Sequence, residues 1–221
     1  MYQNSYRPLT QFSMFPPVIK NLLILNGLVF LATMTPVLSR VLVQWFALWP
    51  VGNSGLPGGF ASFLPWQLVT YSFLHGGFTH LLFNMFALWL FGVQIENTWG
   101  SRRFTIFYFV CVIGAGLIQL IVASSSGTVY PTVGASGGIF GILLAFGMMF
   151  PNQPIYIYFL FPIKAKWLVI MYGVLELWAA VTGTQAGVAN FAHLGGMLFG
   201  FLLIQYWRGK LPIRPGRTMY W

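Results

Sequence analysis

Six apolar stretches, each bounded by charged or turn-forming residues, dominate this chain of 221 residues. The hydrocarbon core of a bilayer is about 30 Å thick, so a helix rising 1.5 Å per residue needs about 20 apolar residues to cross it. The six stretches approach that length and are therefore predicted to be transmembrane helices. They run over residues 18–39, 69–94, 104–124, 135–150, 167–182 and 191–207.

The shortage of charge supports a membrane location. Charged residues make up 6% of the chain and hydrophobic residues 57%, with a mean hydropathy of +0.76. A water-soluble domain is about 25% charged, because polar groups must cover much of its surface. We therefore predict an all-α polytopic membrane protein with six transmembrane helices.

The composition excludes several kinds of site. The chain has no aspartate, its only acidic residues are Glu96 and Glu176, and it has one cysteine. A Ser-His-Asp triad, paired aspartates and a cysteine-based metal cluster are therefore excluded. The sequence also lacks an HExxH zinc motif. We expect no metal and no organic cofactor.

The net charge of +9 is explained by membrane topology better than by binding to nucleic acid. If the N-terminus is cytoplasmic, every Lys and Arg except Arg40 lies on the cytoplasmic side, as the positive-inside rule requires. We expect a multi-pass protein of the bacterial inner membrane with both termini cytoplasmic. Residues 1–17 and 208–221 form its tails, and residues 40–65 form an aromatic-rich, irregular loop at the lipid interface. The basic tail at 208–221 either contacts anionic lipid headgroups or is simply solvated.

The fourth stretch is too short to cross the membrane. Ser136 lies only 15 positions before Pro151, which corresponds to about 22 Å of helix. The fourth helix is therefore predicted to begin inside the membrane. The preceding residues 124–134 would then enter the bilayer as irregular backbone, which is tolerated only against protein or a water-filled cavity. We therefore predict an aqueous pocket that opens to the outer face of the membrane.

Polar residues of three stretches lie at similar depth. Ser136 is 15 residues before Pro151, and His193 is also 15 residues before the end of its stretch at Arg208. His80 is 16 residues before Glu96, and Asn84 lies one turn deeper on the same helical face. Polar side chains at such depth are costly and normally face a helix bundle interior or a functional site.

Each of these residues also has a structural interpretation. His80 and Asn84 could form hydrogen bonds between helices, and His193 could be a buried interhelical donor. Ser136, which stands among glycines, could serve close helix packing. Gly196 and Gly200 form a G-x-x-x-G face that allows another helix to approach closely.

Together, the polar residues fit nucleophilic catalysis. Ser136 offers a hydroxyl, and His193 can act as its general base if the two side chains meet. Without aspartate the arrangement is a dyad. The Ser136 backbone N–H at the start of a helix, with His80 and Asn84, could stabilise an oxyanion.

These residues resemble the rhomboid family of intramembrane serine proteases. The resemblance covers nearly the whole predicted membrane core, residues 18–207, and consists of several motifs in order. They are the segment from His75 to Asn84, Glu96 with Gly100 and Ser101, the segment Gly134–Gly137, and the segment Ala192–Gly196 with Gly200.

The resemblance implies a nucleophile, a base and their support. Ser136 would be the nucleophile and His193 the base, with His80, Asn84 and the Ser136 amide as the oxyanion hole. Phe140 would pack against the catalytic imidazole. The substrates would be other membrane proteins, cleaved in or beside a transmembrane segment after lateral entry past the fifth span. The supporting residues would be Phe140, Gly134, Gly137, Gly196, Gly200 and His75.

Two positions lie outside this pattern, and His75 within it has no catalytic role. Gln67 stands where some family members have Arg, which removes any Arg-based contact within the first external loop. Glu176, in the fifth stretch, has no role that the resemblance supplies. We interpret it as a protonated or hydrogen-bonded structural carboxyl. We interpret His75 as a donor that anchors a loop near the outer interface.

Two other functions are considered. The chain could be an inactive membrane chaperone or dislocation scaffold resembling derlins, but such relatives generally lack the Ser-His pair that this chain keeps. It could also be a channel or transporter for small solutes. The polar layer stops about 22 Å short of the cytoplasm, however, and no inverted repeat is visible.

Overall fold

The computed structural model describes residues 12–52, 62–126, 130–157, 160–184, 189–213, 215, 216, 218 and 219. Most of these residues are helical, and a short hairpin lies between two of the helices. The elements are α1 (Pro17–Thr33), α2 (Pro36–Phe46), α3 (Gln67–Thr70), the 3-10 turn η1 (Tyr71–Phe73), α4 (Phe78–Trp99), α5 (Ser101–Ser126), α6 (Ser136–Met149), β1 (Pro154–Ile157), β2 (Phe161–Lys164), α7 (Ala165–Thr182) and α8 (Asn190–Trp207).

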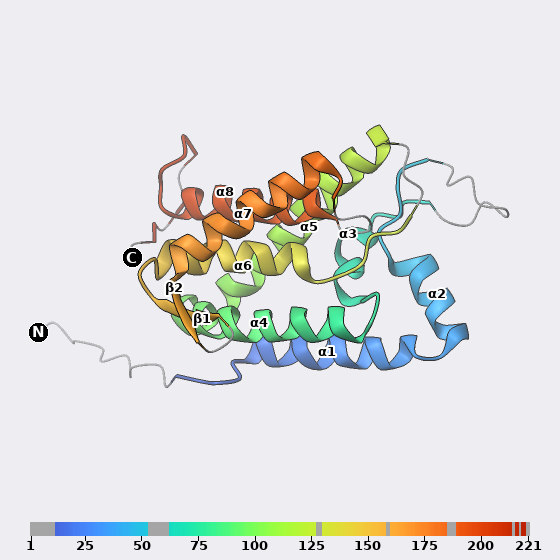
Figure 1. Ribbon diagram of the computed structural model, residues 1–221, viewed down its shortest axis with the longest axis horizontal. Coiled ribbons are helices and arrows are strands. Elements are labelled where there is room, and N and C mark those ends of the chain that lie inside the picture. The colour runs from blue at the N-terminus through green and yellow to red at the C-terminus, as the bar shows by residue number, and fades with distance from the viewer. Residues whose placement is uncertain are drawn as a thin grey trace, which may run out of the picture.

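The long helices form a bundle around α6. Helix α6 contacts α4, α5 and α8, while α1 packs on α4, and α7 packs on α6 and α8. Figure 1 shows α1, α4, α6, α7 and α8 running along the long axis of the molecule, with the β1–β2 hairpin at one end and α2 at the other. Since successive long helices alternate in direction, α4, α6 and α8 all begin near the end that carries α2.

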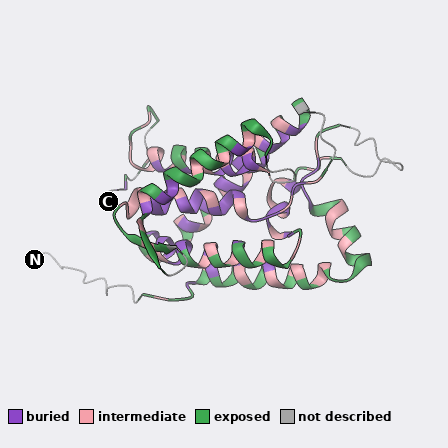
Figure 2. Ribbon diagram, viewed as in Figure 1, coloured by how far each residue is buried: buried purple, intermediate pink, exposed green. Residues whose placement is uncertain are grey.

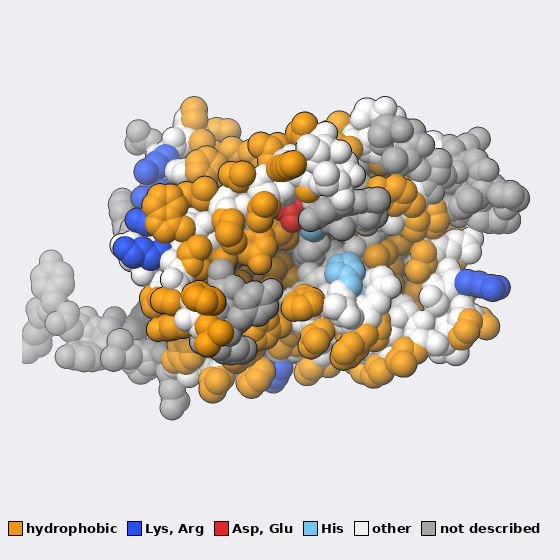
Figure 3. Space-filling view, in the orientation of Figure 1, with side chains coloured by type: hydrophobic (Ala, Val, Ile, Leu, Met, Phe, Trp, Pro, Cys, Tyr) orange, Lys and Arg blue, Asp and Glu red, His pale blue; other side chains and the backbone are white. Residues whose placement is uncertain are grey.

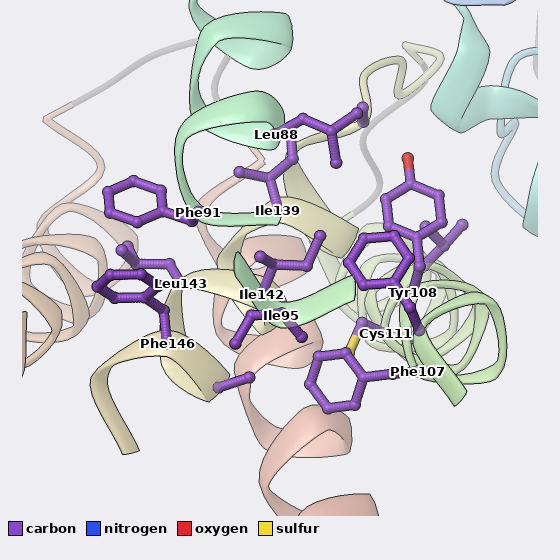
Figure 4. Packing of buried hydrophobic residues seen from close by; sticks show 14 of the residues in the cluster. Leu88, Phe91, Ile95, Phe107, Tyr108, Cys111, Ile139, Ile142, Leu143 and Phe146 are labelled. Atoms are coloured by element: carbon purple, nitrogen blue, oxygen red, sulfur yellow. The ribbon is translucent and has the colours of Figure 1, made fainter. Parts of the chain in front are cut away.

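Large side chains fill the space between α4, α5 and α6, as Figure 4 shows. Ile95 of α4, Phe107 of α5 and Ile142 of α6 are fully buried. Burying such a side chain contributes about 1.5–3 kcal/mol in water, but between helices in lipid the gain comes chiefly from close packing. The labelled members of the cluster are Leu88, Phe91, Ile95, Phe107, Tyr108, Cys111, Ile139, Ile142, Leu143 and Phe146.

The outward faces of the peripheral helices are apolar. Figure 2 shows exposed residues along α1, α2, α4 and α7, and many of them are large hydrophobic side chains such as Leu28, Phe83 and Val174. Within the described ranges, three helices are long and apolar enough to cross a membrane: α4, α7 and residues Ser101–Ser125 of α5. Helices α1 and α6 are shorter apolar helices. Such a surface suits a lipid environment.

The structure corrects two boundaries near the N-terminus. The stretch predicted as one helix over 18–39 is two helices, because α1 ends at Thr33 and α2 begins at Pro36. Proline has no N–H and a fixed φ, so it starts a helix more readily than it continues one. The loop predicted over 40–65 is accordingly helical as far as Phe46. Residues 53–61 of that loop lie outside the described part of the chain.

Two further boundaries differ from the prediction. The stretch expected as a helix from residue 69 begins within α3 and includes η1, and its long helix α4 begins only at Phe78, after Gly76 and Gly77. Serines 124–126, expected to be irregular, belong to α5. The fold is also not purely helical, because β1 and β2 form an antiparallel hairpin in which Ile155 pairs with Ile163. Isoleucine and tyrosine in β1 favour a strand.

Part of the basic tail folds back onto the bundle. The Met219 N–H donates to the Trp207 carbonyl at 2.8 Å, and the Met219 side chain is buried. This described part of the tail is therefore packed against the end of α8 and is not simply solvated.

Glu96 joins the starts of two helices. Its carboxylate accepts the backbone N–H groups of Val18 and Ile19 at 3.0 and 2.9 Å, and the Ser101 hydroxyl at 2.7 Å. The first N–H groups of a helix have no partner within the helix, and the positive end of the helix dipole favours an anion there. The buried carboxylate thus fixes α1 and the start of α5 to the end of α4.

We expect Glu96→Gln to lower the free energy of unfolding by about 1–3 kcal/mol, because an amide lacks the charge and presents a donor to groups that are themselves donors. Unfolding in mixed micelles with increasing dodecyl sulfate measures this. The control is Thr98→Val on the same helix, whose exposed hydroxyl donates to the Gln94 carbonyl. It should change stability by less than about 0.5 kcal/mol. Equal stability of the wild type and Glu96→Gln would contradict the role of Glu96.

Candidate active site

Ser136 and His193 meet at the starts of two helices. Ser136 is the first residue of α6, and His193 lies in the first turn of α8. The Ser136 Oγ is 2.8 Å from the His193 Nε2, which is hydrogen-bond distance. This pair has the geometry required of a nucleophile and its general base.

A contact between glycines brings the two side chains together. A Cβ atom on Gly196 of α8 would collide with the carbonyl oxygen of Gly137 in α6. One turn further along, a Cβ on Gly200 would lie 3.4 Å from the Cα of Gly141. The two backbones therefore touch, as the predicted G-x-x-x-G face requires. His193 stands one turn before Gly196.

The His193 ring is held by aromatic packing. Phe140, one turn after Ser136, stacks on the imidazole with ring centroids 4.3 Å apart and planes 6° apart. Tyr172 of α7 packs edge-on against Phe140 at 6.2 Å. The stack limits rotation of the imidazole about its side-chain bonds, as predicted for an aromatic residue at position 140.

His80 of α4 lies beside the backbone that leads to Ser136. Gly134 has a φ of +128°, and a Cβ there would lie 2.9 Å from the His80 Nε2 and 3.6 Å from the Ser136 Oγ. Only glycine fits both the conformation and the space. The Gly76 N–H points at the His80 Nδ1 over a long 3.4 Å. This contact favours the tautomer with a proton on Nε2, which can then be donated into the site.

Asn84 is buried one turn below His80. Its Nδ2 donates one hydrogen to the His80 carbonyl at 2.9 Å, which ties the amide to its own helix. A primary amide carries two hydrogens, so one remains for another acceptor. The structure therefore gives Asn84 a fixed position and a spare donor.

His75 lies beside His80. Its ring is buried and packs edge-on against His80, with centroids 5.1 Å apart. This packing places His75 beside the site. Its role as a donor that anchors a loop stays a prediction.

The irregular backbone before Ser136 is paired with protein groups. Leu48 and Thr132 exchange two backbone hydrogen bonds of 3.0 and 2.9 Å, and the Gly134 N–H donates to the Tyr71 carbonyl at 3.0 Å. Such pairing is what non-helical backbone needs where water is scarce. Residues 127–129 of this segment lie outside the described part of the chain.

Gln67 forms hydrogen bonds to both described ends of the first loop. Its buried Oε1 accepts the backbone N–H groups of Trp49 and Leu64, both at 3.2 Å, and its Nε2 donates to the Trp45 carbonyl at 3.4 Å. An amide can both accept and donate. Gln67 therefore holds the described ends of this loop.

Two polar residues near His193 were not predicted as part of the site. The Glu176 carboxylate of α7 lies 2.9 Å from the His193 Nδ1, and it accepts a 2.7 Å hydrogen bond from the Asn190 side chain. The carboxyl is thus hydrogen-bonded, as expected, but its neighbour is the candidate base. The sequence signal was present, since an acid within an apolar stretch indicates function. The contact between α7 and α8 could not be read from the chain.

The site opens to one face of the molecule. Figure 3 shows a hollow between the regions of α7 and α4 in which an acidic side chain and histidine side chains are visible. Within the described part of the chain, His, Cys, Asp and Glu side chains form no group of three that could bind a metal ion.

Comparison with known proteins identifies a family for this arrangement. A sequence model of the Rhomboid domain matches residues 62–209. The chain is 32% identical over 190 residues to "Putative rhomboid protease YdcA" of Bacillus subtilis, which covers 85% of this chain and 86% of that protein. It is 36% identical over 144 residues to "RHOMBOID-like protein 4" of Arabidopsis thaliana, covering 62% and 33%. It is 34% identical over 137 residues to "Rhomboid protease GluP" of Bacillus subtilis, covering 62% and 25%. The chain thus spans less than half the length of several relatives that it matches.

The close contact between Gly196 and Gly137 can be tested by adding a methyl group at Gly196. We expect Gly196→Ala to lower the free energy of unfolding by about 1–3 kcal/mol, because the added methyl would collide with the Gly137 carbonyl. The matched control is Gly27→Ala in α1, where a Cβ would have no neighbour within 4 Å. Alanine favours a helix, so this change should leave stability unchanged or raise it by up to about 1 kcal/mol. Unfolding in mixed micelles measures both variants, and equal effects at the two positions would refute the contact.

Proposed function

The chain belongs to the rhomboid family, and on that basis we propose that it is an intramembrane serine endopeptidase that cleaves other membrane proteins in or beside a transmembrane segment. The observation that carries this proposal is the 2.8 Å contact between the Ser136 Oγ and the His193 Nε2. Two of the relatives are named as proteases, one of them as putative. The substrate is a peptide bond, and no cofactor takes part.

The reaction begins with attack by the serine. The Ser136 Oγ bonds to the carbonyl carbon of the scissile peptide while its proton passes to the His193 Nε2. The C–N bond then breaks, its electron pair stays on the leaving nitrogen, and that nitrogen takes the proton from His193. An ester on Ser136 remains. Water next gives a proton to His193 and a hydroxyl to the acyl carbon, and the proton returns to the Ser136 Oγ as the ester breaks.

Three donors would stabilise the oxyanion formed in both steps. The Ser136 backbone N–H lies at the start of α6, where helix N–H groups have no partner within the helix. The His80 Nε2 and the spare hydrogen of Asn84 are the other two. One donor of this kind contributes about 2.7–4 kcal/mol to the stability of the transition state. The fixed positions of His80 and Asn84 support the assignment, because a donor that is already oriented costs no reorganisation during the reaction.

We propose a membrane domain over residues 18–207 with six spans, between cytoplasmic tails at 1–17 and 208–221, in a bacterial inner membrane. The distribution of charge supports this orientation: Figure 3 shows Lys and Arg side chains mainly at one end of the molecule, the end that carries the hairpin. Arg40 lies in α2 at the other end. Arg7, Arg214 and Arg217 lie outside the described residues. Helix α6 has 14 residues, about 21 Å, so it would begin inside the bilayer.

Substrates would enter beside α7. This helix packs at the edge of the bundle, and its outward residues Trp167, Val174 and Val181 are among the exposed hydrophobic side chains. The hollow beside α7 in Figure 3 supports this route, because a transmembrane helix could reach it from the lipid. The substrate helix must unwind locally there, because the carbonyls of an intact helix are engaged in hydrogen bonds within the helix and are shielded from attack.

Covalent labelling tests the proposal. We expect a fluorophosphonate to label the purified wild type, and the wild type to cleave a model transmembrane substrate in detergent micelles. Ser136→Ala should do neither, and His193→Ala should slow both by at least about 1,000-fold, because each removes one member of the dyad. Thr182→Val, an exposed position of α7, serves as the control and should behave like the wild type. Failure of the wild type to label or cleave would instead favour an inactive scaffold or a channel.

Asn84→Ala tests the oxyanion hole. We expect kcat to fall about 100-fold or more while KM changes less than about threefold, because the negative oxygen exists only along the reaction path. Steady-state kinetics with the same substrate measure both constants. Thermal unfolding of the variant checks that the helix remains intact. A rise in KM with unchanged kcat would show that Asn84 binds the substrate and does not stabilise the oxyanion.

A further inference from the structure

Glu176 supplies a carboxylate to the candidate base from a different helix. Its Oε2 lies 2.9 Å from the His193 Nδ1, while the His193 Nε2 faces Ser136 at 2.8 Å. The imidazole therefore stands between a hydroxyl on one side and a carboxylate on the other. This order of groups is that of a Ser-His-acid triad, in which the acid may be Asp or Glu.

The carboxylate is held in place by a second residue. The Asn190 Nδ2 donates a 2.7 Å hydrogen bond to the same Oε2 that contacts His193. Asn190 lies three residues before His193, on the same face of α8, so one turn of helix presents both groups to Glu176. Glu176 is the only acid of α7 and lies in the interior of an apolar helix, where a carboxyl without partners would be costly.

We propose that Glu176 is a positioning residue that orients His193 and fixes its ring proton on Nδ1. The inference rests on the proposed function, since it concerns the base of that same reaction. With the proton on Nδ1, the Nε2 lone pair faces Ser136 and can accept the hydroxyl proton. The carboxylate also stabilises the imidazolium that forms when that proton arrives.

The contact is close but not yet well aligned. The carboxylate lies off the direction of the ring N–H, so the pair does not form a hydrogen bond of good geometry. Hydrogen bonds between catalytic groups are often poorly aligned before the substrate binds, and they tighten in the complex. Because Glu176 comes from α7 and His193 from α8, a small movement between the two helices changes this alignment. Orientation of the base is thus coupled to the position of α7.

The groups that face His193 come from three other helices. Ser136 and Phe140 of α6 face its Nε2 and its ring plane, and Glu176 of α7 faces its Nδ1. His80 of α4 is a further titratable group that interacts with it electrostatically. Of these groups only Glu176 can accept the Nδ1 proton.

Kinetics of two variants test the proposal. Glu176→Gln keeps the size but removes the charge, and Glu176→Leu also removes the acceptor. We expect kcat to fall at least about tenfold in Glu176→Gln and further in Glu176→Leu, with KM within about twofold of the wild type. Thr182→Val on the same helix is the control and should keep the wild-type kcat. Both Glu176 variants should unfold at the wild-type temperature or above it, because a neutral side chain suits an apolar helix.

Nitrogen NMR gives a readout that a purely structural role would not change. The chain has three histidines, so spectra of protein with ¹⁵N-labelled histidine are assigned by comparison with His193→Ala. We expect the wild-type His193 to carry its proton on Nδ1. In Glu176→Leu the Nε2–H form should become populated, since no acceptor remains at Nδ1.

The outcomes separate this inference from the proposed function. An active wild type with both Glu176 variants within twofold of its kcat would overturn the inference and leave the proteolysis intact. A rise in KM alone, or a loss of activity with a lower unfolding temperature, would also overturn it. An inactive wild type would refute the proposed function, and the NMR would then decide: an Nδ1–H signal unchanged in Glu176→Leu overturns the positioning role, and its loss supports that role.

Discussion

Close packing of α6 against α8 sets the geometry on which the candidate site depends. Where a Cβ on Gly196 would strike the Gly137 carbonyl, the two backbones approach more closely than ordinary side chains allow. Helices in lipid gain no hydrophobic advantage from association, so such contacts between small residues are a main source of their stability. The same contact brings His193 to Ser136, because each of these residues lies within one turn of a glycine of the interface. The first turns of α6 and α8 therefore provide both the helix contact and the candidate catalytic pair.

Backbone polar groups near this contact are paired with protein groups. Backbone bonds to Leu48 and Tyr71 pair the irregular segment before Ser136, and Gln67 holds the described ends of the first loop. At the opposite end, Glu96 accepts the free N–H groups of α1. In hydrocarbon every unpaired group of this kind costs several kcal/mol, so a non-helical segment can lie near the site only where the fold supplies partners. An apolar exterior and paired backbone groups in the interior both follow from a lipid environment.

The long helices and the depth of the candidate catalytic pair could be predicted from the sequence. The predictions that were wrong or missing have identifiable physical reasons. Apolar length located the long helices, and counting residues from their ends placed Ser136 and His193 at one depth. Depth along a helix does not give its rotation or its neighbour, so the contact of Glu176 with His193 could not be derived. Pro36 could have indicated the break between α1 and α2, but the apolar length of 18–39 outweighed it. The isoleucines and tyrosine of 154–157, which lie between two predicted helices, could have indicated a strand.

The central claim is that Ser136 attacks a carbonyl carbon while the oxygen of that carbonyl is held by donors from α4 and α6. A crystal structure of the protein after reaction with a fluorophosphonate tests it most directly, since the bound phosphonate resembles the tetrahedral intermediate. The account predicts a covalent bond from the Ser136 Oγ to phosphorus, with the phosphoryl oxygen within hydrogen-bond distance of the Ser136 N–H, the His80 Nε2 and the Asn84 Nδ2. A phosphonate attached to another residue, or one whose oxygen faces away from these donors, would contradict it.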